Sequence, residues 1–176
     1  FVAWPVPGAG FDYEAGGVKP EWLGAHALEG FTAHWQKNSN LAWAFDTWWL
    51  NLFPRERPFL FNAGGYSTLS FIPTLGTMIL GLIAGGWLRE DRDALWKLAR
   101  LGAASFLCFA FAVALDVTGL CPIVKRIWTP GWVLFSAGWC FALLGAFYLV
   151  MDAWGARRWA FPLTVIGMNS IAAYLI

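Results

Sequence analysis

Long apolar runs separated by short polar segments fill the second half of the 176-residue chain. A helix needs about 20 predominantly apolar residues to cross roughly 30 Å of hydrocarbon. Four runs are apolar and long enough to be read as spans, at 68–88, 101–120, 127–151 and 159–176. The pattern predicts an all-α, polytopic transmembrane helix bundle over 66–176. Residues 1–65 form a separate segment, in which 1–6 is expected to be the end of a preceding span.

Residues 8–65 form a long loop rich in tryptophan. Within it, 41–53 (LAWAFDTWWLNLF) predicts an amphipathic or interfacial helix. Tryptophan is common at headgroup depth because the indole is apolar with one N–H. We therefore expect Trp48 and Trp49 to lie at the membrane surface or to be buried by the bundle. A loop of this length is either functional, packed as a lid, or simply rests on the bilayer.

The composition narrows the class of protein. Hydrophobic residues make up 59% of the chain and charged residues only 13%, whereas soluble domains average roughly 25% charged residues. The net charge of +1 provides no field that would gather an anionic polymer. These values exclude a disordered chain, a nucleic-acid-binding protein and an ordinary soluble enzyme domain.

Basic residues are distributed unevenly between the two ends of the predicted bundle. Loops 89–100 and 152–158 carry six Lys/Arg in 19 positions, whereas loops 8–65 and 116–129 carry six in 72. Short loops dense in Lys and Arg face the cytoplasm. The sequence therefore predicts that 8–65 is external, which in a bacterial inner membrane means periplasmic.

Local signals mark two features of the predicted spans. Thr129 before Pro130 combines a capping hydroxyl with proline at the first helical position, which predicts the start of the third span. Gly81 and Gly85 form a GxxxG step that would let another helix approach closely.

Common catalytic and metal-binding motifs do not occur. His26 and His34 have no acidic or cysteine partner at ligand spacing, so no metal is predicted. Three widely spaced cysteines give neither a disulfide framework nor a zinc site. There is no nucleophile elbow, zinc-protease motif or phosphate-cradling glycine loop.

The hairpin 121–130 is one of three features that could carry chemistry. Lys125 and Arg126 are adjacent cations close to Trp128, and together they could hold a phosphate or carboxylate. The alternative is that both cations snorkel to lipid phosphates.

Polar groups within or beside the spans need partners. Asn169 and Ser170 lie in the middle of the fourth span, either as helix–helix contacts or lining a cavity. Asp116 ends the second span, and Lys125 or Arg126 is its expected ion-pair partner.

The same stretches resemble a known family. CPIVKRIWTPGWVLFSAGWC, FPLTVIGMNSIAAY and FIPTLGTMILGLIAGGWL are similar to the second half of the heparan-α-glucosaminide N-acetyltransferase family and its bacterial relatives, over roughly 66–176. The resemblance implies transfer of acetyl from cytosolic acetyl-CoA to a sugar amine across the membrane. It places the acid/base histidine in an amino-terminal half outside this chain, so no catalytic residue is assigned here. The family's Asp-Pro-Glu-Gly before the first span is Gly64-Gly65-Tyr66-Ser67 in this chain, which indicates a divergent branch.

Three functions remain open from the sequence. In an acyltransferase, Lys125, Arg126, Trp128, Asn169 and Ser170 would line the path of acetyl-CoA or the acceptor. In an accessory subunit of a larger membrane complex, or a homo-oligomer, the tryptophan-rich faces would pack against partners. A transporter of a lipid-linked glycan would use the same bundle without chemistry. The chain begins at Phe1 and stops within an apolar run, so we expect it to be part of a longer protein.

Overall fold

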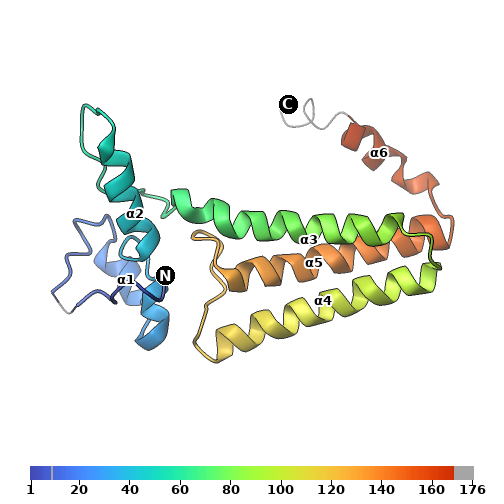
Figure 1. Cartoon of the computed structure of the whole chain (residues 1–176), viewed down its shortest axis with the longest axis horizontal. Helices are drawn as coiled ribbons and strands as arrows, with labels where there is room; N and C mark the ends of the chain where they lie inside the picture. Colours follow the sequence, from blue (N-terminus) through green and yellow to red (C-terminus); the bar gives the residue numbers. More distant parts are fainter. Residues whose placement is uncertain (9, 169–176) are drawn as a thin grey trace.

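The computed structural model describes residues 1–8 and 10–168, and within these residues all regular structure is helical (Figure 1). The amino-terminal segment contains α1 (Pro20–His26), η1 (Gly30–Trp35), α2 (Leu41–Trp49) and η2 (Leu50–Leu52). The rest of the described chain contains η3 (Thr68–Ser70), α3 (Phe71–Arg89), α4 (Ala94–Val117), α5 (Pro130–Tyr148), η4 (Leu149–Ala153), η5 (Arg158–Ala160) and α6 (Phe161–Met168).

Three of these helices are long and apolar enough to cross a membrane, over Thr68–Arg89, Ala94–Val117 and Pro130–Ala153. Their 22, 24 and 24 residues correspond to lengths of about 33–36 Å at 1.5 Å per residue. That exceeds the roughly 30 Å of a hydrocarbon core. The protein is therefore a membrane-embedded helical protein, as the apolar runs predict.

The observed helix boundaries differ from the predicted ones at the second span and at residues 1–6. The second helix begins at Ala94 and not at 101. Its first turns carry Lys97 and Arg100, so the apolar run from which the span was predicted begins later than the helix. It ends at Val117, two residues before Gly119, whose φ of +69° breaks the helix. Residues 1–6 form a turn closed by the Trp4 N–H and the Phe1 carbonyl (2.9 Å), so the expected helical end of a span is absent there. For the fourth run, the structure describes only α6, and residues 169–176 lie outside the described part.

The helices α4 and α5 form the tightest contact. The Ser105 hydroxyl donates to the Gly138 carbonyl across 2.9 Å, and a Cβ on Gly138 would lie 3.0 Å from the Phe109 ring. Leu101 and Ala112 are fully buried on the same face of α4. The absence of a side chain at Gly138 therefore brings the two backbones together, as small residues do in membrane helix pairs.

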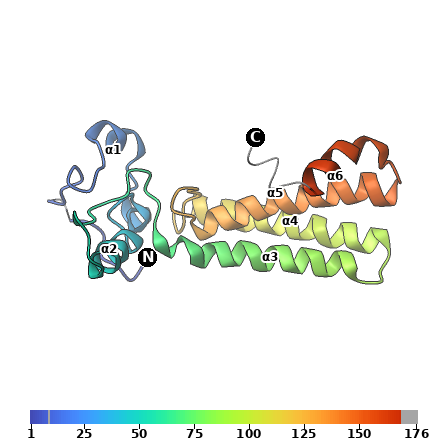
Figure 2. The same ribbon diagram turned by 90° about the horizontal axis from the view of Figure 1, so that it is seen from above.

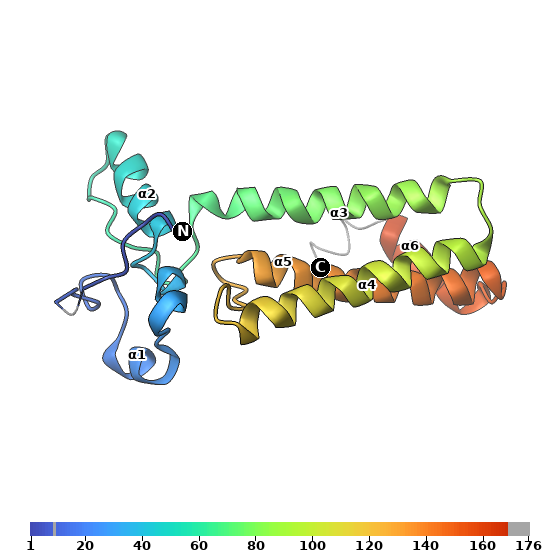
Figure 3. The ribbon, with the colours of Figure 1, turned by 60° about the horizontal axis from the view of Figure 1, so that its bottom comes forward.

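The helix α3 lies beside α5 but buries little of its surface (Figures 1 and 3). Ala84 is its only buried residue. Gly81 and Gly85 have no neighbouring atom near the position of a Cβ. The close helix approach predicted for the GxxxG step is therefore not made within residues 1–8 and 10–168, and this face of α3 is uncovered there.

The amino-terminal segment is a packed unit at one end of the three long helices (Figure 2). Its interior is polar: Gln36, Asn38, Ser39, Asn40 and Asp46 are all buried. The Asn38 amide donates to the carbonyls of Gly16 (2.8 Å) and Asn62 (3.1 Å). The burial of the Asn38 amide is tolerated because it donates hydrogen bonds to backbone carbonyls, which in a segment of loops are not paired in regular secondary structure.

A helix is present at the predicted position 41–53, as α2 and η2. Its start is set by Asn40, whose side-chain oxygen accepts the Trp43 N–H at 3.0 Å. Trp48 and Trp49 keep 59% and 38% of their surface exposed. The expected alternative that the bundle buries both indoles is therefore not realised. Part of their apolar surface is uncovered by the protein.

Hydrogen bonds join the segment to the long helices at two places in the described chain. Both carboxylate oxygens of the buried Asp46 accept the Thr68 N–H, at 3.1 and 2.9 Å, where the first long helix begins. A negative charge at a helix start is favourable because the first N–H groups have no partner within the helix. The Trp35 indole N–H donates to the Leu120 carbonyl at 3.2 Å. The segment is thus held to the start of η3 and to the hairpin between α4 and α5.

The loops carrying the dense basic residues share the opposite end. The turn between α3 and α4 and the region after α5 both lie away from the amino-terminal segment (Figures 1 and 2). There Arg100 lies over the Trp96 ring at 4.5 Å and over the Trp87 ring at 5.6 Å. Such cation–π contacts are typical of residues at a membrane–water boundary.

Candidate anion-binding site

The hairpin between α4 and α5 is closed by one buried hydroxyl. Thr129 is fully buried, and its hydroxyl donates to the Pro122 carbonyl at 2.7 Å. It accepts the N–H groups of Val124 (3.1 Å) and Trp132 (3.2 Å). Thr129 is therefore both the predicted cap of α5 and the closure of the hairpin, and it fixes the residues between.

Within the hairpin, the adjacent cations Lys125 and Arg126 point to different surroundings. Arg126 lines the cavity described below, whereas Lys125 is exposed and is not part of its wall. Trp128 has a φ of +52°, its indole N–H is buried without a partner in the described chain, and it does not line that cavity. Of the five candidate residues, the structure brings only Arg126 to the cavity, while Asn169 and Ser170 lie outside the described residues.

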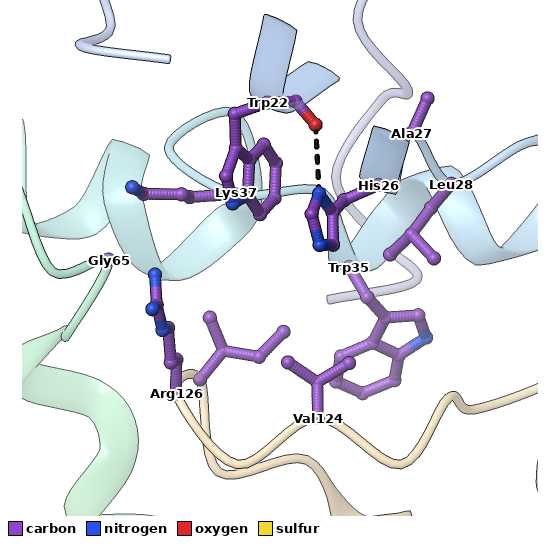
Figure 4. Close-up of a pocket in the computed structure, with 10 residues that line it drawn as sticks. Trp22, His26, Ala27, Leu28, Trp35, Lys37, Gly65, Val124 and Arg126 are labelled. Atoms are coloured by element: carbon purple, nitrogen blue, oxygen red, sulfur yellow. Dashed lines mark hydrogen bonds between the residues drawn. The ribbon is translucent and has the colours of Figure 1, made fainter. Parts of the chain in front are cut away.

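The cavity lies between the amino-terminal segment and the hairpin and has a volume of about 300 Å³ (Figure 4). Its wall is mostly aromatic and aliphatic. It is formed by Trp22, His26, Ala27, Leu28, Trp35, Lys37, Gly65, Val124, Arg126 and Ile127. No aspartate or glutamate is among these residues.

Lys37 is one of two cations in this wall. Its ammonium donates to the Ala63 carbonyl at 2.8 Å and lies 5.3 Å from the centre of the Trp22 ring. Burial lowers the pKa of Lys37, and the neighbouring Arg126 charge lowers it further. Since like charges repel, the charged forms of Lys37 and Arg126 destabilise each other.

Arg126 is the second cation. Its side chain extends from the hairpin toward Gly65 and Lys37 (Figure 4). In the described part of the chain it makes no ion pair, the one ion pair there being Arg157 with Asp152 at 2.8 Å. A guanidinium has five donors in a planar fork that matches phosphate or carboxylate oxygens.

His26 adds a polar atom to the aromatic wall. Its ring stacks on Trp22 with centroids 4.9 Å apart and planes 11° from parallel. His26 Nδ1 lies 3.1 Å from the Trp22 carbonyl oxygen, and a carbonyl can only accept, so Nδ1 carries the proton. The remaining nitrogen, Nε2, faces the cavity (Figure 4) and in the neutral ring accepts a hydrogen bond.

The expected ion pair of Asp116 is not formed. Its carboxylate accepts the Ile123 N–H at 3.0 Å within the hairpin, and among the described residues neither Lys125 nor Arg126 lies within ion-pair distance of it. A local backbone donor therefore takes the place of the predicted cation, which leaves Arg126 available to the cavity.

Sequence reasoning missed Lys37, Trp22 and His26 as members of this site. Each lies about 90 or more positions from the hairpin in the chain, and only the folding of residues 8–65 brings them to it. The stacked pair at positions 22 and 26, four residues apart in the α1 region, was the one available signal.

A second cavity of about 220 Å³ lies between α3 and α5. Thr77 and Cys140 are its most polar residues, and the rest of the wall is leucine, alanine, glycine and phenylalanine. It has no charged group, so it has the character of a helix or acyl-chain contact and not of a polar site. No cluster of three potential metal ligands occurs among residues 1–8 and 10–168.

Together, the fold and the site define a membrane-embedded helical protein with a cationic, aromatic pocket at one end of its apolar helices. No protein-family model, curated protein or solved structure matches the chain.

Proposed function

We propose that the chain is part of an integral-membrane acyltransferase in a bacterial inner membrane, with the pocket at the acceptor side of the bilayer. The resemblance of 66–176 to an acetyltransferase family supports acyl transfer, and the position of the pocket supports its assignment to the acceptor side. The pocket lies at the end of the long helices away from the loops that hold the dense basic residues. Because such loops face the cytoplasm, the pocket and residues 8–65 face the periplasm.

This arrangement divides the two substrates between the two ends. Acetyl-CoA is cytosolic, so it reaches the helices from the basic end. The acceptor meets the apolar wall of Trp22 and Trp35, the two cations, and His26 Nε2 as a hydrogen-bond acceptor. Lys125 and Trp128, outside this wall, are not part of the proposed acceptor contact.

The reaction would be attack of an acceptor amine on the thioester carbonyl. A C–N bond forms, the C–S bond breaks, coenzyme A leaves as its thiol, and the amine proton passes to a base. We assign no catalytic residue within this chain. Its role is to bind and orient the acceptor, which accelerates transfer by placing the amine close to the thioester.

The test is transfer by the purified full-length protein in lipid vesicles. Acetyl-CoA with a radiolabelled acetyl group is supplied together with glucosamine 6-phosphate as the probe acceptor, since it has an amine for transfer and an anionic group for the two cations. The proposal expects labelled N-acetylglucosamine 6-phosphate to accumulate with time, and heat-inactivated protein to give none. Folded protein that forms no acetylated product with this amine would contradict it.

One observation favours a second function, that of a subunit in a larger complex or homo-oligomer. The apolar face of α3 that includes Met78 and Leu82 is uncovered in the described chain, where these residues are 59% and 74% exposed. A subunit would bury this face against a partner helix, and Leu82→Gln would then reduce the size of the complex in mild detergent. An unchanged size would leave α3 facing lipid.

A further inference from the structure

The pocket beside the hairpin contains positive charge without a counter-ion. Lys37 and Arg126 come from segments far apart in the chain and meet on one wall. None of the ten lining residues is acidic. Two like charges in one wall, with no acidic residue beside them, favour the binding of an anion between them.

The donors are suited to a phosphate ester. Arg126 offers a planar fork of donors that two phosphate oxygens can accept together, and Lys37 offers a second positive charge near it. A phosphate monoester carries about −1.5 to −2 at neutral pH, which balances two cations better than a carboxylate does. The lowered pKa of Lys37, caused by burial and by Arg126, is a cost that such an anion would relieve.

The rest of the wall indicates the body of the ligand. Trp22, Leu28, Trp35, Val124 and Ile127 give flat and aliphatic surface with few polar groups. The volume of about 300 Å³ equals roughly ten water molecules at 30 Å³ each. An apolar group the size of one ring, or the first carbons of a lipid, fits this space.

We propose that the pocket binds a phosphate ester with an apolar body, the phosphate between Lys37 Nζ and the Arg126 guanidinium and the body against Trp22 and Trp35. This rests on the proposed function in treating the pocket as the acceptor end, and it names the chemistry of the ligand there. The ester is either a soluble molecule or the phosphate of a membrane lipid, since both present phosphate oxygens at the end of the helices.

The test is binding of phenyl phosphate to the purified full-length protein in nanodiscs of phosphatidylcholine, measured by calorimetry. Inorganic phosphate tests the contacts of the phosphate group alone, and benzyl alcohol tests those of the apolar body alone. We expect phenyl phosphate to bind more tightly than either one. Equal affinity for phenyl phosphate and inorganic phosphate would contradict the apolar half of the site.

Arg126→Gln and Lys125→Gln form a matched pair of variants. Each removes one exposed cation from adjacent positions, and only Arg126 lines the pocket. Loss of a charge-assisted hydrogen bond predicts an affinity at least about tenfold weaker for Arg126→Gln, with less than about twofold change for Lys125→Gln. Equal losses in the two variants, or none in Arg126→Gln, would overturn the proposal. Unchanged thermal midpoints show that both variants are folded.

Nanodiscs that also contain phosphatidylglycerol separate the two sources of the ester. If the lipid supplies it, phosphatidylglycerol weakens phenyl phosphate binding to the wild type and not to Arg126→Gln. If a soluble ester is the ligand, both nanodiscs give the same affinity and Arg126→Gln stays weaker. Acetyl transfer is measured on the same samples. If phenyl phosphate binds but no acetyl group is transferred, the acyltransferase proposal is wrong and the phosphate-ester site stands. If acetyl is transferred but phenyl phosphate does not bind, only the phosphate-ester proposal is wrong.

Discussion

Thr129→Val tests how the hairpin is held, because valine keeps the shape of the side chain and removes only its hydroxyl. That hydroxyl makes three hydrogen bonds shorter than 3.3 Å in a fully buried position: it donates to Pro122 and accepts from Val124 and Trp132. At about 1 kcal/mol net for each bond, and somewhat more for groups left buried and unpaired, the change should destabilise the protein by roughly 2–4 kcal/mol.

The assay is the thermal midpoint of the purified protein in detergent. A loss of roughly 2–4 kcal/mol corresponds to a midpoint lowered by about 4–16 °C for a chain of this size. Phenyl phosphate binding should weaken as well, since Val124 and Arg126 stand on the same hairpin.

Two control variants make the result specific. Thr129→Ser keeps the hydroxyl and should restore most of the midpoint. Thr118→Val removes an exposed hydroxyl that bonds only within the end of α4, at 2.7 Å to the Ala114 carbonyl, and should change little. A midpoint for Thr129→Val no lower than that for Thr118→Val would refute the reasoning.

Three further outcomes follow from individual residues. Gly138→Leu should lower the thermal midpoint strongly, because a Cβ there already meets an α4 ring at 3.0 Å, whereas Gly85→Leu, which has open space, should not; equal effects would contradict the packing. Cys121 should resist iodoacetamide until the protein unfolds, because it is 5% exposed and burial raises its pKa; mass spectrometry of the folded protein would detect any early labelling. Phenyl phosphate binding should weaken with rising pH, because Lys37 loses its proton below the usual lysine range. Arg126→Gln should shift that loss to higher pH, and an unshifted calorimetric profile would speak against coupling of the two cations.

The long helices could be predicted from the sequence because their signal is local. Long apolar runs mark most of Thr68–Arg89, Ala94–Val117 and Pro130–Ala153, and Thr129 before Pro130 marks a helix start whose capping bond is present at 3.2 Å. The apolar run 41–53 likewise predicted α2, and the structure adds the cap by the Asn40 side chain.

The site could not be predicted in the same way because its members are brought together by tertiary folding. Lys125 and Arg126 are equivalent as neighbours in a sequence, and only the course of the hairpin places one in the pocket and the other outside it. Ser39 belongs to a polar run of the kind usually found in solvated loops, yet it is 2% exposed in the packed segment. Asp116 has cations nearby in sequence but is held by the Ile123 N–H, a partner that every residue type except proline supplies and that no pattern reveals.

The account depends most on the claim that the helices cross the membrane with the pocket on the side opposite the basic loops. The direct measurement is labelling of single cysteines by a membrane-impermeant maleimide in intact cells and in inverted vesicles. Glu56→Cys and Asp91→Cys are suitable because both positions are exposed and lie toward opposite ends of α3. We predict labelling of the residue 56 variant from outside intact cells and of the residue 91 variant only in inverted vesicles. Labelling of both from the same side would contradict the account.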